Sequence, residues 1–203
     1  KNMVYAASSS TYGDHPGLPK VEDKIGKPLS PYAVTKYVNE LYADVFSRIY
    51  GFHTLGLRYF NVFGPKQNPN GAYAAAIPLF IKAAIEGQAP TINGDGEQSR
   101  DFTFVENAVQ ANIRALLSNN ISQHEIMNIA FGERTTLNQL WDYLSSILNI
   151  YIKPNFGPQR IGDVRDSLAD ISKANRLINY NPLFDLKKGL EITLMGNRSS
   201  VGS

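Results

Sequence analysis

Apolar and polar residues follow one another along the chain in blocks that predict strands alternating with helices. The chain opens on a short apolar run, Met3 to Ala7, which is typical of a buried strand, and a second such run covers 54–59. Between them, the cap residue Ser30 and the first-turn proline Pro31 predict a helix that continues to Tyr50 and is closed by Gly51. This alternation indicates an α/β fold with parallel strands.

The second half of the chain continues the alternation with shorter elements. Thr136 is expected to cap a helix that runs to Leu148, because its leucines and Trp141 share one face at helical spacing and form part of the core. Residues 61–71, rich in Pro, Asn and Gly, indicate a loop, and 197–203 an unstructured tail. The other expected elements are helices at 74–86, 106–117, 172–178 (capped by Ser172) and 185–196, strands at 90–93, 101–105 and 127–130, and a turn at 94–96.

Composition excludes several classes of protein. The 203 residues make roughly one large or two small domains, and 43% of them are hydrophobic, enough for a core. With 20 basic and 18 acidic residues the net charge of +2 predicts no nucleic-acid partner. The chain has no cysteine, its three histidines lie far apart, and it has no membrane-spanning run, so thiolate chemistry, a metal site and a membrane partner are not expected. The default expectation is a soluble cytoplasmic protein.

Tyr32 and Lys36 stand four residues apart on the first predicted helix, so their side chains share one face. A tyrosine has a reference pKa of about 10 and acts as a base near neutral pH only after a shift of roughly three units. A cation at about 4 Å supplies roughly 4 kcal/mol of the stabilisation required, at an effective dielectric constant of about 20. The same spacing occurs by chance on many helices, so the pair alone does not define a site.

Ser8 lies at the carboxyl end of the first predicted strand, where ligands bind in open α/β sheets. Its hydroxyl can bridge a substrate oxygen and the Tyr32 oxygen. A purely structural role in a cap or turn suits Ser9 and Thr11 better. These residue types together predict a proton-relay site formed by Ser8, Tyr32 and Lys36.

Five segments extend this pattern over most of the chain: SSSTYGD, SPYAVTK, LRYFNVFGP, INGDGEQSRDF and RIGDVRDS. In this order they resemble the extended short-chain dehydrogenase/reductases, specifically the UDP-N-acetylhexosamine 4-epimerases of bacterial polysaccharide synthesis. The resemblance implies part of a Rossmann-like parallel sheet with a smaller α/β lobe for the substrate. It also implies NAD as a prosthetic group and interconversion of UDP-N-acetylglucosamine and UDP-N-acetylgalactosamine, with UDP-glucose and UDP-galactose as a second pair.

The resemblance also implies roles for individual residues. Tyr32 would take the proton of the sugar C4 hydroxyl while hydride passes to NAD+, Lys36 would lower the tyrosine pKa and hold the nicotinamide ribose, and Ser8 would share the substrate O4. The resulting 4-keto sugar would turn about its diphosphate before hydride returns to the other face. The further implied contacts are Ser9 and Ser10 beside O4, Phe60 at the cofactor, Asn61 at the diphosphate, Arg100 and Arg160 as diphosphate clamps, and Asp163 at the uridine ribose.

Side-chain chemistry agrees with these roles, because guanidinium forks suit phosphate oxygens and a carboxylate suits vicinal ribose hydroxyls. An arginine taken singly is equally consistent with an ion pair, such as Arg100 with Asp101. Related dehydratases carry Asp and Glu where this chain has Ser9 and Ser10, and related decarboxylases keep the Glu, so both reactions are disfavoured. Galactose-restricted epimerases carry a tyrosine at the position of Ser167, and this small residue, with Ala75 and Gln67, leaves room for an N-acetyl group.

A dinucleotide-binding fold needs a glycine-rich turn between its first strand and helix, and no segment of this chain supplies one. We therefore expect a fragment that lacks the amino-terminal half of the family's NAD-binding domain, binds NAD poorly and is inactive alone. The expected divisions are 1–63 and 105–130 for the remnant of the NAD-binding domain, 64–104 and 131–196 for the UDP-sugar-binding lobe, and 197–203 for the tail.

Two other interpretations of the sequence remain open. One is another nucleotide-sugar enzyme of the same family, such as a reductase, a dehydratase or a different epimerase. The other is a non-catalytic module that binds nucleotide sugars. A homodimer through the Tyr32 helix is a further expectation, although packing on the sheet accounts for much of the same apolar surface; the seam residues would be Tyr37, Leu41, Tyr42, Val45 and Phe46.

Overall fold

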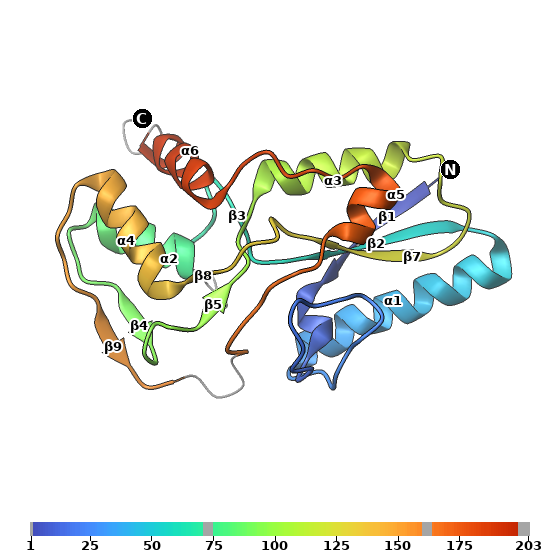
Figure 1. Ribbon diagram of the computed structural model, residues 1–203, viewed down its shortest axis with the longest axis horizontal. Helices are drawn as coiled ribbons and strands as arrows, with labels where there is room; N and C mark the ends of the chain where they lie inside the picture. The colour runs from blue at the N-terminus through green and yellow to red at the C-terminus, as the bar shows by residue number, and fades with distance from the viewer. Residues whose placement is uncertain (1, 71–74, 160–163, 199–203) are drawn as a thin grey trace.

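The computed structural model describes residues 2–70, 75–159 and 164–198, with side chains to Gly196. One part of it is built on a three-stranded parallel sheet in the order β1–β2–β7, from β1 (Asn2–Ser8), β2 (His53–Tyr59) and β7 (Glu125–Ile129). Helices α1 (Pro31–Tyr50) and α3 (Val105–Leu117) lie on opposite faces of this sheet (Figure 1). The predicted α/β class with parallel strands is confirmed.

Local sequence signals explain why α1 has the bounds that were predicted. The Ser30 side chain accepts a hydrogen bond from the Ala33 N–H at 3.1 Å, and Pro31 occupies the first helical position, where a missing N–H costs nothing. At the other end Gly51 adopts a left-handed φ of 68°, a conformation that glycine reaches without a Cβ clash. These two caps set where the helix begins and ends.

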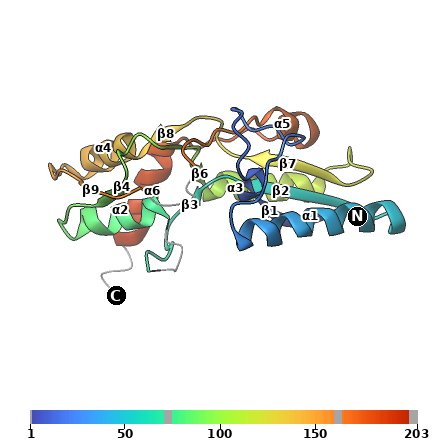
Figure 2. The ribbon, with the colours of Figure 1, turned by 90° about the horizontal axis from the view of Figure 1, so that it is seen from below.

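The second lobe lies at the opposite end of the molecule from the N-terminal end of β1 and the C-terminal end of α1 (Figures 1 and 2). Its core joins residues from α2 (Ala76–Ile85), α4 (Leu137–Leu148) and α6 (Leu186–Arg198), and the rings of Phe80 and Trp141 pack perpendicular to each other. As predicted, Leu140, Trp141 and Leu144 are buried on one face of α4. Three short strand pairs complete the lobe and its junction with the sheet: β3 (Val62–Phe63) with β6 (Thr103–Phe104), β4 (Thr91–Asn93) with β9 (Asn155–Gly157), and β5 (Ser99–Arg100) with β8 (Thr135–Thr136).

Four sequence predictions are corrected by the structure. Ser172 is the first residue of α5 (Ser172–Ile178) and not its cap; the Asp170 side chain accepts the Ser172 N–H instead. Helix α5 packs its Ala174 into the core of the sheet, although the sequence assigned it to the second lobe. Residues 61–71 contain β3, and α6 continues two residues beyond Gly196.

One edge of the sheet carries no strand. Within the described ranges β1 pairs only with β2, so the opposite edge of β1 has no partner strand. A hollow of about 710 Å³ runs beside it between β1 and α1, lined largely by apolar side chains such as Met3 and Phe46. No helix in the described part of the chain has the length and apolar character needed to span a bilayer.

Candidate active site

A cavity of about 260 Å³ lies where β1 and β2 end. Both strands run parallel and finish side by side, with Ser8 opposite Tyr59 in the register, so the residues that follow them face the same space. The cavity collects predicted site residues from four separate parts of the chain: Ser8, Ser9, Ser10, Phe60, Asn61, Arg100 and Ser167. The structure therefore brings together residues that lie as much as 159 positions apart in the sequence.

The Ser8 hydroxyl has a defined hydrogen-bonding state. Ser8 caps a short 3-10 helix, η1 (Ser9–Tyr12), and its Oγ accepts from the Ser10 N–H at 3.2 Å and from the Ser10 hydroxyl at 2.9 Å. A serine hydroxyl has two acceptor positions and one proton to donate. Since both acceptor positions are used, Ser8 is set up to donate its proton to a ligand oxygen in the cavity.

Tyr32 and Lys36 lie together on the first two turns of α1, next to this cavity. The Lys36 Nζ is 5.8 Å from the centroid of the Tyr32 ring and donates to the Ala6 carbonyl of β1 at 3.0 Å. The neighbours of Tyr32 in the sequence, Ser30 and Ala33, line the cavity. Tyr32 itself is 53% exposed and is not one of the residues that line the cavity.

A second cavity, of about 210 Å³, shares Asn61 and Arg100 with the first and continues into the second lobe. Asn61 has a positive φ of 39° and its Nδ2 donates to the Asp101 carbonyl at 2.9 Å, which fixes the chain where it leaves β2. The Arg100 guanidinium donates to the carbonyls of Ser99 and Arg165 at 2.9 and 3.0 Å. These bonds hold a cation at the junction of the two cavities.

The remaining predicted residues divide into three groups. Ala75 lines the second cavity, whereas Gln67 lines neither cavity and donates from Nε2 to the Val62 carbonyl at 3.3 Å. The Ser167 N–H donates to the Ser99 carbonyl at 3.1 Å, which holds its side chain in the first cavity. Arg160 and Asp163 lie outside the described residues.

The first cavity also contains Lys20, which the sequence analysis did not select. Lys20 is 4% exposed and its Nζ donates to the His15 carbonyl, while its backbone forms a bridge with Ala169. Desolvation lowers the pKa of this ammonium group. Because Lys20 sits in a Pro- and Gly-rich connection without periodicity, no local signal marked it; its place depends on the long-range bridge.

A buried carboxylate lies directly behind Arg100. The Asp101 side chain accepts N–H bonds from Phe131, Gly132 and Ala169 at 3.1 to 3.2 Å. Burial raises the pKa of Asp101 to about 7, against the opposing effect of these N–H donors. The side chain thereby joins the segment after β7 to the one that carries Ser167.

Known proteins are similar in sequence to nearly the whole of this chain. The family model for "NAD dependent epimerase/dehydratase family" matches residues 1–130, more than half of the chain. The chain belongs to this family. The UDP-glucose 4-epimerase of Mycolicibacterium smegmatis is 30% identical over 195 residues, which are 96% of this chain and 61% of that protein. A UDP-glucuronate 4-epimerase from Thermodesulfobacterium geofontis is 34% identical over 99% of this chain and 60% of its own length.

Solved structures of epimerases have the same fold as this family member. The UDP-N-acetylglucosamine 4-epimerase of Methanobrevibacter ruminantium, in complex with UDP-N-acetylmuramic acid, superposes with a TM-score of 0.93 at 40% identity, covering 98% of this chain and 64% of that one. The UDP-glucuronic acid 4-epimerase of Bacillus cereus, in complex with UDP-glucuronic acid and NAD, gives 0.90 at 32% identity, covering 98% and 62%. The chain thus spans about 60% of the length of the curated relatives cited here.

Proposed function

We propose that this chain carries the catalytic residues and part of the nucleotide-sugar site of an NAD-dependent 4-epimerase acting on UDP-N-acetylglucosamine and UDP-N-acetylgalactosamine. The observation that carries the proposal is the single cavity lined by Ser8, Asn61, Arg100 and Ser167 beside the Tyr32 turn of α1. Chemistry at C4 needs a proton acceptor and a hydrogen-bond donor near one carbinol, and a diphosphate needs a fixed cation. We assign the role of proton acceptor to Tyr32, that of hydrogen-bond donor to Ser8 and that of fixed cation to Arg100.

In the proposed reaction each of these residues acts on a stated atom. Tyr32 Oη removes the proton from the C4 hydroxyl and returns it in the second half-reaction. Ser8 donates its hydroxyl proton to the C4 oxygen, in agreement with the two hydrogen bonds that its Oγ already accepts. Lys36 stabilises the phenolate electrostatically, since its ammonium lies beside the Tyr32 ring.

This chain offers residues for only part of NAD, the cofactor that the family implies. Of the three N–H donors of Lys36, the Ala6 carbonyl takes one, which leaves two for the hydroxyls of a nicotinamide ribose. Lys36 also lines the hollow along the free edge of β1, and Phe60 lies in the wall of the first cavity. When bound, NAD supplies the hydride acceptor and donor. No glycine-rich turn for its pyrophosphate occurs in the 203 residues, so we propose that this end is held by polypeptide outside this sequence.

The lining of the cavities favours epimerisation over elimination. Among the described residues that line the two cavities there is no aspartate or glutamate, so the acid/base pair that a dehydratase uses has no candidate there. The small residues Ser167 and Ala75 support an acetylated sugar. Lys20 and Arg100 supply two cations for a substrate that carries a diphosphate.

The test joins the chain to the glycine-rich amino-terminal part of a related epimerase and supplies UDP-N-acetylglucosamine with NAD+. We expect UDP-N-acetylgalactosamine to accumulate, the Tyr32→Phe variant to lose at least about 1,000-fold in rate while UDP binding is unchanged, and Tyr50→Phe, at the exposed end of α1, to keep full activity. Mass spectrometry of the product separates the alternatives, because a dehydratase product has lost water. Wild-type rates in Tyr32→Phe would exclude the proposed base.

A further inference from the structure

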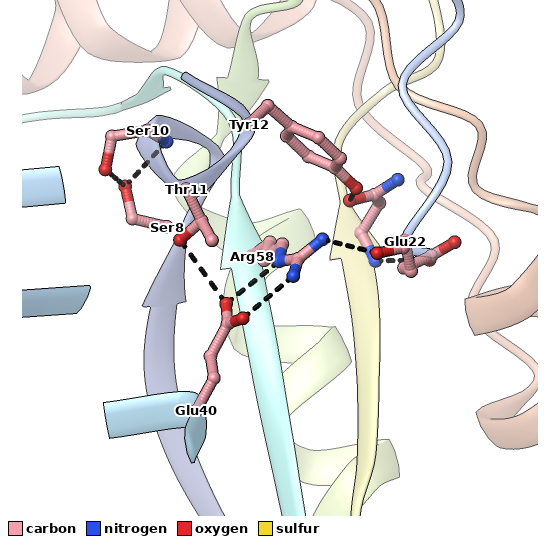
Figure 3. A network of polar contacts seen from close by, with 8 residues as sticks. Ser8, Ser10, Thr11, Tyr12, Glu22, Glu40 and Arg58 are labelled. Atoms are coloured by element: carbon pink, nitrogen blue, oxygen red, sulfur yellow. Dashed lines mark hydrogen bonds and ion pairs between the residues drawn. The ribbon is translucent and has the colours of Figure 1, made fainter. Parts of the chain in front are cut away.

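Glu40 and Arg58 form an ion pair in the interior of the molecule, below the candidate active site. The Arg58 Nε and Nη2 donate to the two carboxylate oxygens of Glu40 at 2.9 and 2.8 Å, and the two side chains are 3% and 2% exposed (Figure 3). The third guanidinium nitrogen, Nη1, donates to the Glu22 carbonyl at 3.0 Å. All three nitrogens of the guanidinium therefore donate hydrogen bonds, two of them to the Glu40 carboxylate and one to the Glu22 carbonyl.

The two residues come from the elements that carry the proposed catalytic groups. Glu40 follows Tyr32 and Lys36 at intervals of four along α1, so the three side chains share one helix face. Arg58 on β2 pairs with Ala7 on β1, and Ala7 is the residue directly before Ser8. The ion pair thus ties the Tyr32 helix to the strand end that presents the serine.

A third contact extends this link into the cavity wall. The Thr11 hydroxyl donates to the same Glu40 oxygen that binds Arg58 Nε, at 3.4 Å, and Thr11 belongs to η1, the short helix that begins directly after Ser8. Figure 3 shows Glu40 reaching from α1 to Thr11 on one side and Arg58 on the other. The Glu40 carboxylate therefore connects α1 both to η1, through Thr11, and to β2, through Arg58.

The end of η1 is fixed by the same network. The Arg58 guanidinium lies over the Tyr12 ring, 4.8 Å from its centroid, and the Tyr12 hydroxyl donates to Asn128 Oδ1 at 2.6 Å. Burial raises the pKa of Tyr12 to about 12, so its hydroxyl keeps the proton that it donates. The Asn128 N–H in turn donates to Glu22 Oε1 at 2.8 Å, which connects β7 to the segment that already binds Arg58.

Stability alone is a weak reason for such a pair. Removing two charges from water offsets much of their attraction, and apolar replacements of similar size are often as stable. A fork-to-fork contact does, however, fix distance and direction between two elements in a way that apolar packing does not. We propose that Glu40 and Arg58 are positioning residues, which hold α1 and the Ser8–Tyr12 segment in the one arrangement that aims Tyr32 and Ser8 at the same sugar oxygen. This inference rests on the proposed function.

The experiment replaces the pair by apolar side chains in the full 203-residue chain. The double variant Glu40→Met/Arg58→Met leaves no unpaired charge, so we expect it to fold with a Tm near that of the wild type. Amide hydrogen exchange then reports on η1, in which the Ser10 N–H binds Ser8 Oγ and the Gly13 N–H binds the Ser10 carbonyl. We expect both amides to exchange at least about tenfold faster, and the Kd for UDP-N-acetylglucosamine to rise about tenfold.

A matched control removes a different ion pair from the same helix. Arg48 and Asp44 form a surface pair at 3.0 Å, and Asp44→Met/Arg48→Met should leave exchange and affinity unchanged. If the Glu40→Met/Arg58→Met variant fails to fold, Thr11→Val, which removes only the hydroxyl contact with Glu40, is expected to raise exchange at Ser10 and Gly13 with no change in Tm. Wild-type exchange and affinity in a folded double variant, or wild-type exchange in Thr11→Val, would overturn the proposal.

Failure of the proposed function and failure of the positioning role give different experimental results. If the wild-type chain does not bind UDP-N-acetylglucosamine at all, the proposed function fails, and the exchange rates of Ser10 and Gly13 still decide whether the ion pair orders η1. If the wild type binds and the double variant binds equally well, the positioning role fails while the proposed function stands.

Discussion

The side chains around Arg100 decide how well this chain would hold a diphosphate. Two backbone carbonyls orient the guanidinium at the junction of the two cavities, and Asp101 fixes the segments behind it. A guanidinium group can bind one phosphate through two parallel N–H groups, which the ammonium group of a lysine does not do.

We therefore expect Arg100→Lys to weaken binding of UDP about tenfold, since a charge-assisted hydrogen bond contributes roughly 1.5–3 kcal/mol and one tenfold step in Kd is about 1.4 kcal/mol. Isothermal titration calorimetry measures this change. Arg48→Lys, an exposed substitution on α1, is the control and should bind as the wild type does. Equal Kd values for all three proteins would exclude Arg100 from the site.

The raised pKa of Asp101 predicts how the free energy of unfolding depends on pH. Its pKa is raised in the folded chain to about 7 from an ordinary value of 3.8. Between these two values the folded state keeps a proton that the unfolded state has lost, so the free energy of unfolding falls as pH rises from about 4 to about 7 and levels off above. The fall is at most about 4 kcal/mol, because each pKa unit corresponds to about 1.4 kcal/mol.

Urea denaturation at pH 5 and pH 7.5 checks this expectation. The wild-type chain should lose stability between the two values, and Asp101→Asn should lose less. Asp142→Asn, on the exposed face of α4, should follow the wild type. Identical pH profiles for the wild type and Asp101→Asn would contradict the assignment.

At the scale of elements, the caps explain why the predicted bounds of α1 and α4 agree with the structure. In α4 the Thr136 Oγ1 accepts the Gln139 N–H at 3.1 Å, and Gln139 Oε1 accepts the Thr136 N–H at 3.0 Å, a reciprocal capping box. The helix that follows buries Trp141 and its neighbours in the second lobe and lies next to the cavity residue Leu137.

Thr136→Ala should therefore cost about 1 kcal/mol in the free energy of unfolding, as the loss of an N-cap usually does. Ser146→Ala, at an exposed position of the same helix, should cost nothing or add slightly to stability, since alanine has the higher helix propensity. Chemical denaturation of both variants is the measurement. Equal stability of the two would show that the capping box contributes nothing.

The elements that the sequence missed share one property. Strands β3, β5 and β8 have two residues each, and β9 has three, which is too short for an alternation of side chains to show. They exist because distant segments lie beside them, as Ser99 pairs with Thr136. The position of α5 was missed for a related reason, since the apolar face of a seven-residue helix fits either core.

At the scale of the whole molecule, the candidate site lies where segments of the sheet and of the second lobe meet. Ser8 is the last residue of β1 and Asn61 follows β2, whereas Arg100 and Ser167 come from paired segments beside the second lobe. The sequence analysis selected Ser8 from its place at the end of a predicted strand, and Asn61, Arg100 and Ser167 from the family resemblance. Their common cavity was not predicted, because it depends on long-range pairing. Lys20 was missed because the bridge that places it joins residues 149 positions apart.

The free edge of β1 and the exposed side chains of α1 bear on partners of the chain. Leu41, Tyr42, Val45 and Phe46 are 38–64% exposed, as a dimer seam on this helix requires. The homodimer and the NAD-binding segment outside this sequence remain predictions.

The central claim is that one cavity of this chain binds a UDP-sugar between Arg100 and Ser8. Titration of the isotope-labelled 203-residue chain with UDP-N-acetylglucosamine, followed by amide NMR shifts, tests it directly. With UDP-N-acetylglucosamine we predict saturable shifts at Ser8, Ser9, Ser10, Asn61, Arg100 and Ser167. With UDP alone we predict shifts at Asn61 and Arg100 but none at Ser8, Ser9 and Ser10. No saturable shift, or shifts confined to residues outside this cavity, would contradict the account.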